Sequence, residues 1–411
     1  MSDTELRVLI ERLNNLVQNV HQYVGARYVP NFIDEPWNET TGYQALDVVD
    51  NGEGTSYIAR KPVPAGTPLT NRSYWFVYGA YSGAILHLQD QIDDLVADVN
   101  NIASVKMFGA VGDGVTDDTQ AFIDCFAAYD TVIIPDGTYK LSSSFGRITG
   151  KTVIGYGATL KLDYELQFRK CSITGVTFIS DHNLSAFDNA EFIDCTFDGS
   201  DLPSDHSTMI IALADGGKDY TFKRCSFSGA NNASFGIWCD LSGSNGGSLY
   251  VEQCVFTTIW LNAIFSSLLR NNIEGSVFWH THLQASPNGG GEIDFKKNSG
   301  STTTQTCIVK NNIFYAPSST SQNTAHIETE GGDQIIIEGN YFNSVGVDAA
   351  SIVLQSASRA NIISNTFTGD ADKTAITTFG GSKIIASGNY FNVYGTHYSD
   401  ASDVISATDF N

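Results

Sequence analysis

The sequence predicts an all-β protein whose main body is a right-handed parallel β-helix, preceded by short coiled-coil helices and a small β module. Three observations predict this fold. A short unit ending in phenylalanine recurs through the second half of the chain, and two amphipathic heptad runs lie in its first quarter. The composition is rich in Gly, Ser, Thr and Asn, and only 17% of the residues are charged. Turn-forming residues at this frequency are typical of a chain with many short strands.

The recurring unit consists of alternating apolar residues, then Cys, Ser or Asn, one further residue, and Phe. Its intervals run from 22 residues (Phe256 to Phe278) to 36 residues (Phe278 to Phe314), within the range of solenoid coils. If each coil lays a short strand on the next, about 4.8 Å away, the phenylalanines form an internal ladder. The Cys, Ser and Asn residues are then expected at one bend of each coil. The ladder comprises Phe197, Phe227, Phe256, Phe278, Phe314, Phe342, Phe367 and Phe391.

Five segments are expected along the 411 residues. They are an N-terminal coiled-coil helix (1–24), a small β-rich module (25–83), a second coiled-coil helix or neck (84–104), the β-helix (105–395) and a C-terminal tail (396–411). Both helical runs alternate apolar steps of three and four residues, which predicts self-association. A single amphipathic helix docked on its own domain is the alternative, and the oligomer number does not follow from these heptads. Tryptophans in so small a module are expected in its core.

Charge and composition disfavour several classes of partner. The chain has 45 acidic and 23 basic residues and a formal charge of −22, which repels nucleic acid and anionic membranes. We find no signal peptide and no apolar run of 18 residues, so we expect a protein made in a cytosol and not inserted in a membrane. The seven cysteines show no metal-binding spacing and are expected to pack in the core.

A second recurring strand comes before the phenylalanines. Its central isoleucine lies 15 residues upstream in three successive coils, and looser matches precede them. If these isoleucines point inward, their sequence neighbours point outward and form columns down the solenoid. The three pairs are Ile327 with Phe342, Ile352 with Phe367 and Ile376 with Phe391, and the earlier isoleucines are Ile237, Ile264 and Ile293.

The outward columns concentrate acidic side chains on two adjacent coils. Asp294 and Glu328 would hold their carboxyl groups about 5 Å apart, so both cannot ionise cheaply and one pKa should rise. Such a separation is typical of a retaining glycosidase, whereas Glu292 and Glu328 across a diagonal would suit an inverting one. The candidate catalytic residues are therefore Asp294, Glu328 and Glu292. The candidate binding residues are Trp238, Phe265, His326, Glu330 and Lys296.

The same residues permit other interpretations. They could form a solvated or glycan-binding acidic face, on which Glu292–His326 and Lys296–Glu330 are modest surface ion pairs. No cofactor is predicted and no metal ligand is assigned, although an acidic cluster of this kind is also a possible Ca²⁺ site.

Two segments before the repeats carry a resemblance to a known family. Phe108–Phe122 reads FGAVGDGVTDDTQAF, and Thr131–Leu141 reads TVIIPDGTYKL. They resemble the opening of the pectate-lyase-like β-helix (pectin-lyase superfamily) of bacteriophage tail-spike and tail-fibre proteins. The acidic run Asp113, Asp117 and Asp118 is expected to cap a helix and form turns.

The resemblance implies a virion protein, made in the host cytoplasm. It implies a homotrimer that is joined to other tail proteins through its N-terminal region, with 25–83 as an attachment module. It also implies binding to a bacterial surface glycan during host adsorption. Depolymerisation of that polysaccharide by a hydrolase or lyase with paired carboxylates is left open. The alternatives are a non-catalytic structural or adhesive fibre and, disfavoured by the heptads and the missing signal peptide, a cellular lyase or hydrolase.

Overall fold

The computed structural model describes the chain in two compact units, Met1–Asn101 and Ile102–Asn411. The predicted coiled-coil segment 1–24 and most of 84–104 lie outside the described residues. Those residues are 31–52, 55–79, 101–144, 146–204, 208–214, 219–230, 232–240, 246–279, 291–297, 303–315, 325–345, 350–355, 359–379, 383–399 and 404–406. In these ranges no helix has both the length and the apolar character needed to cross a bilayer.

The first unit contains a four-stranded sheet in the order β1-β2-β3-β4. β1 pairs with β2 in parallel, and the other pairings are antiparallel. Trp75 is only 1% exposed and packs edge-on against Tyr43, so this tryptophan belongs to the core, as expected. The strands are β1 (Asn31–Phe32), β2 (Asp47–Asp50), β3 (Ser56–Ala59) and β4 (Trp75–Gly79).

The second unit begins with a strand where the sequence predicted the end of a helix. Ile102–Ser104 forms β5, which pairs in parallel with β7 (Thr131–Ile134), so the predicted helix 84–104 is wrong at its C-terminal end. The strand lets Ala103 enter the solenoid core, where it is 1% exposed.

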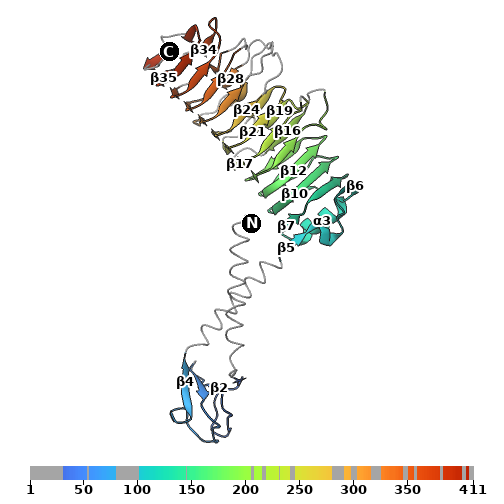
Figure 1. Ribbon diagram of the computed structural model, residues 1–411, viewed down its shortest axis with the longest axis vertical. Helices are drawn as coiled ribbons and strands as arrows, with labels where there is room; N and C mark the ends of the chain where they lie inside the picture. Colours follow the sequence, from blue (N-terminus) through green and yellow to red (C-terminus); the bar gives the residue numbers. More distant parts are fainter. Residues whose placement is uncertain are drawn as a thin grey trace. The chain divides into compact units, whose positions relative to one another are not determined.

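The first coil also carries the described helix, α3 (Thr119–Ala128), which buries Phe122 and Phe126. α3 lies at the β5 and β7 end of the solenoid (Figure 1). Its N-cap is Asp118, whose carboxylate accepts hydrogen bonds from the backbone N–H groups of Val111 and Gly112. The neighbouring elements are η1 (Val105–Phe108), β6 (Asp113–Asp117) and β8 (Gly137–Leu141).

The acidic run of this coil has turn and capping roles, as predicted. Asp113 accepts hydrogen bonds from the backbone N–H groups of Thr116 and Val115, which lower the pKa of its carboxyl. Asp117 accepts from the Thr119 hydroxyl and N–H, and these bonds likewise lower its pKa. Carboxylates engaged in this way stabilise local backbone and are not candidates for catalysis.

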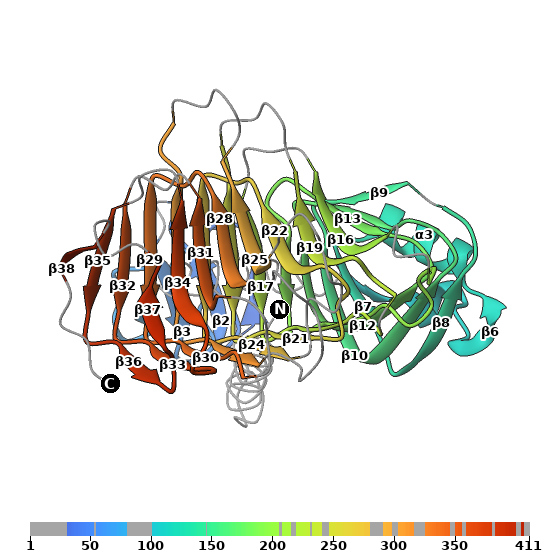
Figure 2. The same ribbon diagram turned by 90° about the horizontal axis from the view of Figure 1, so that it is seen from above.

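The rest of the unit is the predicted right-handed parallel β-helix. One sheet has eleven strands in the order β37-β34-β31-β28-β25-β22-β19-β16-β13-β11-β9, all paired in parallel (Figure 2). Its strands are β9 (Arg147–Thr149), β11 (Gln167–Arg169), β13 (Leu184–Phe187), β16 (Met209–Ala214), β19 (Phe235–Cys239), β22 (Asn262–Ser266), β25 (Gly291–Lys296), β28 (Ala325–Glu330), β31 (Ile352–Gln355), β34 (Thr374–Phe379) and β37 (Thr396–Tyr398).

The remaining strands make two further rows, which meet at the long strands β10 (Thr152–Leu162) and β12 (Ser172–Ser180). One row is β14 (Glu191–Ile193), β17 (Asp219–Lys223), β20 (Ser248–Glu252), β23 (Arg270–Glu274), β26 (Thr306–Lys310), β29 (Gln334–Glu338), β32 (Ala360–Ile363), β35 (Ile384–Ser387) and β38 (Val404–Ser406). The other is β15 (Thr196–Asp198), β18 (Ser226–Ser228), β21 (Val255–Thr257), β24 (Val277–Trp279), β27 (Ile313–Tyr315), β30 (Tyr341–Asn343), β33 (Thr366–Thr368) and β36 (Tyr390–Asn392).

The predicted phenylalanine ladder is present inside the solenoid. Successive rings stack almost parallel, with centroids 4.6 Å apart between Phe197 and Phe227 and 5.0 Å apart between Phe256 and Phe278. The stack continues through Phe314, Phe342, Phe367 and Phe391. Because each ring is buried between the rings above and below it, the ladder contributes hydrophobic burial and aromatic stacking in every coil.

The residue two positions before each phenylalanine lies in a second buried ladder, as predicted. Cysteines occupy it in the early coils, where they are buried and pack as small hydrophobes. Burial raises the pKa of Cys195. Asparagines occupy it later and bond to one another: Asn340 Nδ2 donates to Asn365 Oδ1 at 3.0 Å, and Asn312 Nδ2 donates to Asn340 Oδ1 at 3.0 Å. Asn340 Nδ2 also donates to the Val309 carbonyl at 2.9 Å. The amides therefore satisfy backbone groups at the bend.

The residue before this ladder turns each coil with a positive φ. Glycine holds the position at Gly339 (φ 68°) and Gly388 (φ 67°), whereas Ser364 between them has φ 55°. A left-handed conformation costs an L-residue about 1–2 kcal/mol, more than the entropic cost of glycine.

Ser364→Gly is therefore expected to raise the free energy of unfolding by roughly 0.5–1 kcal/mol, measured by chemical denaturation. Thr366→Gly, two residues later in extended strand β33, is the matched control and should lower it. A destabilised Ser364→Gly variant would contradict the strain argument.

Candidate functional site

The predicted register of the eleven-stranded sheet is confirmed. Ile293 pairs with Ile264 on one side and with Ile327 on the other, and all three are fully buried. The series continues from Ile327 to Ile352 and Ile376. Residues about 30 positions apart are therefore neighbours in space, and β22, β25 and β28 lie side by side (Figure 2).

One outward column forms the centre of the candidate site. Trp238 pairs with Phe265, Phe265 with Asp294, and Asp294 with Glu328, on four successive strands. Since parallel neighbours are about 4.8 Å apart, the two carboxyl-bearing residues lie next to each other, as predicted. The column continues beyond Glu328 to Val353.

The aromatic part of this column is a stacked shelf. The rings of Trp238 and Phe265 have centroids 6.5 Å apart and an interplanar angle of 18°. Phe235, from the start of β19, packs against both rings, at 6.4 Å from Trp238 and 6.1 Å from Phe265. Trp238 and Phe265 keep partial exposure. The shelf therefore leads along the sheet directly to Asp294.

Asp294 is a buried carboxyl with a strongly raised pKa. Its side chain is buried, and burial raises its pKa well above the usual value, with the charges of Glu328 and Glu330 adding to the effect and Lys296 opposing it. Among the described residues, nothing hydrogen-bonds to Asp294 Oδ1. An uncompensated buried carboxylate is costly, so this environment favours the protonated form of Asp294.

Glu328 is equally buried but has a different surrounding. Its Oε1 accepts a hydrogen bond from the amide Nε2 of Gln355, on the next strand. An amide donor favours negative charge on the carboxylate that it contacts. The two neighbouring carboxyl groups are therefore held in unlike environments, which is the arrangement that separates an acid from a base.

Another outward column flanks the carboxyl pair. Lys296 pairs with Glu330 across β25 and β28, and their side chains form an ion pair of 3.1 Å. Both are about half exposed, so the pair contributes at most about 1 kcal/mol to stability. The hydrogen bond and charge of Glu330, and then the charges of Asp294 and Asp240, raise the pKa of Lys296. Asp240 therefore also contributes to the electrostatic potential at Lys296.

The predicted outward placement of Glu292 and His326 is wrong. His326 Nδ1 lies 2.7 Å from Glu292 Oε2, and the two residues are 4% and 2% exposed. The His326 ring is 5.5 Å from the ring of Phe314 and 5.7 Å from that of Phe342, both members of the internal ladder. Glu292 and His326 are therefore an interior pair, and neither faces the outer column.

The backbone hydrogen bonding is irregular at the start of β28. The N–H groups of His326 and Ile327 both donate to the Ser351 carbonyl, at 3.0 and 3.1 Å. When two successive N–H groups share one acceptor, the two residues depart from regular strand geometry, and their side chains need not lie on opposite faces. Strict alternation fails there, and sequence periodicity gives no sign of it.

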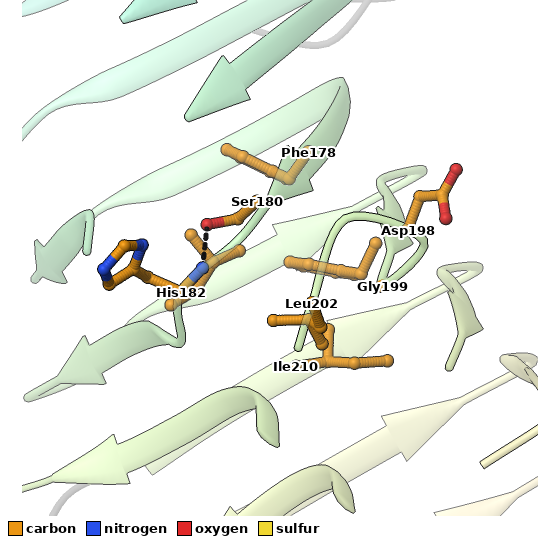
Figure 3. A pocket seen from close by; sticks show the side chains of 9 residues that line it. Phe178, Ser180, His182, Asp198, Gly199, Leu202 and Ile210 are labelled. Carbon is orange, nitrogen blue, oxygen red and sulfur yellow. Dashed lines mark hydrogen bonds between the residues drawn. The ribbon is translucent and has the colours of Figure 1, made fainter. Parts of the chain in front are cut away.

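A small cavity lies elsewhere on the solenoid, away from the Asp294 and Glu328 column. Figure 3 shows a hollow beside Leu202 and Ile210, with the His182 ring and the Asp198 carboxylate pointing away from it. Its volume is about 10 Å³, close to what one water molecule requires and far below a sugar ring. Within the described ranges, no group of three or more His, Cys, Asp or Glu side chains is arranged to hold a metal ion.

Curated relatives of this chain are phage appendage proteins. The chain is 25% identical over 196 residues to the pre-neck appendage protein of Bacillus phage B103, which covers 48% of this chain and 20% of that protein. It is 24% identical over 153 residues to the pre-neck appendage protein of Bacillus phage phi29, covering 37% and 15%. The matches thus span a fifth or less of these relatives' length. They bear out the predicted kinship with phage tail-spike proteins.

A solved phage tailspike shows the same fold. Tailspike protein 3 of bacteriophage CBA120 aligns with a TM-score of 0.51 at 12% identity, over 92% of this chain and 74% of that one. ORF18 of Geobacillus virus E2 aligns with a TM-score of 0.44 at 18% identity, over 90% and 70%. The family model described as adenovirus EB1 55K protein / large t-antigen matches residues 89–337, and the chain belongs to this family.

Proposed function

We propose that this protein is a subunit of a phage tail spike that binds a bacterial surface polysaccharide and hydrolyses it with Asp294 and Glu328. The observation that carries the proposal is Asp294, a buried carboxyl with a raised pKa, adjacent to Glu328 at the end of an aromatic shelf. A protein keeps such a costly pair where its chemistry is used.

The proposed reaction follows the retaining pathway of glycosidases. Protonated Asp294 donates its proton to the glycosidic oxygen as the bond from this oxygen to the anomeric carbon breaks. The Glu328 carboxylate attacks the anomeric carbon and forms a glycosyl ester. Asp294, now ionised, takes a proton from water, and the resulting hydroxide cleaves the ester, which restores both groups. A strand spacing of about 4.8 Å suits the separation of about 5–5.5 Å that this pathway uses.

Finer assignments complete the proposal. Segments 1–24 and 84–100 assemble the subunit as a homotrimer through their heptads, and 25–83 attaches it to other virion proteins. The phage appendage relatives support a place in the virion. A binding-only adhesin is the second candidate. The depth of burial favours it, since Asp294 and Glu328 are only 6% and 4% exposed.

Chain shortening of capsule and wall polymers separates these candidates. Asp294→Asn and Glu328→Gln are each expected to reduce cleavage by roughly 10²–10⁴-fold, because each removes a proton-transfer or nucleophilic group. Glu338→Gln is the matched control, since it neutralises an exposed carboxylate on β29 that pairs with Lys310. If the protein binds the polymer but never shortens it, the binding-only adhesin is the remaining candidate.

The pH profile gives a second test. Asp294 must be protonated to act as the acid, so its raised pKa extends activity to higher pH than an ordinary aspartate would allow. Cleavage falls as pH rises through that pKa. The same carboxyl destabilises the fold when ionised: its contribution is fully favourable below its unfolded pKa and is lost as pH rises through the folded value. Asp294→Asn should therefore be at least as thermostable as the wild type at pH 8. If Asp294→Asn is unfolded, its lack of activity says nothing about the role of Asp294. The activity of Glu328→Gln then tests the proposed function.

A further inference from the structure

The candidate site has an unusual balance of charge. Asp294, Glu328 and Glu330 lie on two adjacent strands, and Asp240 is close enough to raise the pKa of Lys296. Lys296 is the cation beside them, and its ammonium is already paired with Glu330 at 3.1 Å. In the described part of this face, four carboxyl groups therefore lie near a single ammonium group. With Asp294 protonated and Glu330 paired to Lys296, the anionic character of the face comes from Glu328 and Asp240.

The neighbouring sequence supplies few basic residues, namely Lys297 and, in 280–290, His280 and His282. The segments 280–290, 298–302 and 316–324, which precede or follow β25 and β28 along the chain, contain no Lys or Arg. Lys297, next to Lys296, is engaged with Asp333 at 2.7 Å. An anionic sugar would thus meet carboxylates without an unpaired Lys or Arg to compensate its charge.

The remaining surface of the site suits uncharged sugar faces. The shelf of Phe235, Trp238 and Phe265 offers ring faces on which the C–H faces of a sugar can stack. The unpartnered and buried Asp294 Oδ1 marks the polar end of this shelf. Aromatic rings attract cations as well, so an amino sugar is also accommodated.

We infer that the site takes a glycan without negative charge, composed of neutral or amino sugars, and rejects uronic-acid and phosphodiester polymers. This inference rests on the proposed function of the same column. A negative charge about 5 Å from an ionised carboxylate at an effective dielectric constant of about 20 is disfavoured by roughly two orders of magnitude. The expected discrimination is therefore at least tenfold after partial screening by salt.

The test uses the full chain and wall polymers from a panel of bacteria, separated by anion exchange into neutral, cationic and anionic fractions. Cleavage is expected in a neutral or cationic fraction and is expected to be lost in Asp294→Asn. Cleavage of an anionic fraction that requires Asp294 would overturn the substrate class and leave the proposed function standing. If the protein neither binds nor cleaves any fraction, both the substrate class and the proposed function are overturned.

A charge variant tests the cause of the discrimination. Glu330→Gln frees Lys296 and should improve retention on immobilised polygalacturonate, relative to its methyl ester, by roughly fivefold at low salt. Glu338→Gln changes the net charge equally and frees Lys310 on a different sheet, so it should leave this ratio unchanged. Equal effects of the two variants would show that total charge acts, and would overturn the assignment to this site.

Discussion

Replacement of His326 by leucine is expected to lower the free energy of unfolding by about 3–5 kcal/mol. The change leaves the Glu292 carboxyl buried beside the phenylalanine ladder without the imidazole that lies 2.7 Å from it. Such a carboxyl must either ionise without its partner or take up a proton, and both states cost free energy. Chemical denaturation of the purified full chain measures the loss.

The double variant Glu292→Leu with His326→Leu isolates the pair. Removal of both partners leaves no buried charge, so the double variant should be more stable than His326→Leu alone. The exposed pair Lys310–Glu338 provides the control, because loss of Lys310 should cost less than about 1 kcal/mol. The single variant Glu292→Leu completes the cycle. If its loss and that of His326→Leu simply add in the double variant, the pair is not coupled and the interior placement of Glu292 is wrong.

Asn340→Leu is expected to destabilise the solenoid by about 4 kcal/mol, because buried groups on both sides lose partners worth roughly 1–3 kcal/mol each. Asn340 Oδ1 accepts from the Asn312 N–H at 2.9 Å and from Asn312 Nδ2 at 3.0 Å. Its Nδ2 donates to the Val309 carbonyl and to Asn365 Oδ1. Leucine of similar size supplies none of these bonds, and thermal unfolding followed by circular dichroism measures the effect.

A matched substitution tests whether the position in the ladder is what counts. Asn272 lies at the centre of β23 with partial exposure, so Asn272→Leu should change stability by less than about 1 kcal/mol. Comparable losses in the two variants would mean that the asparagine ladder contributes no more than an ordinary surface amide.

The coil register was predictable because the phenylalanine ladder repeats a strong and simple constraint. A phenylalanine two residues after the Cys, Ser or Asn of each bend recurs in coil after coil, and stacking these rings buries them all, so Phe314 and Phe342 lie above each other whatever the loop between them. Once they are aligned, Asp294 and Glu328 become neighbours on the outer wall. Their proximity needed no information beyond the spacing of Ile and Phe.

The direction of a side chain at a bend was not predictable in this way. Glu292 and His326 differ from their outward neighbours only by one position along the strand, and polar residues next to a buried isoleucine ordinarily face solvent. The Ser351 carbonyl, which accepts from two successive N–H groups, turns His326 inward. That contact comes from another coil, and nothing local in the sequence encodes it.

The amino-acid sequence alone determined the solenoid, its ladders and the pairing of Asp294 with Glu328, because periodic burial of large apolar side chains leaves one stacking register. Only the tertiary structure decided which acidic residues face outward and how deeply they are buried. Burial and the field of neighbouring coils raise the pKa of Asp294, while the internal imidazole holds Glu292. Both effects depend on contacts between coils. The sequence repeat predicts which residues lie close together but not the direction in which their side chains point.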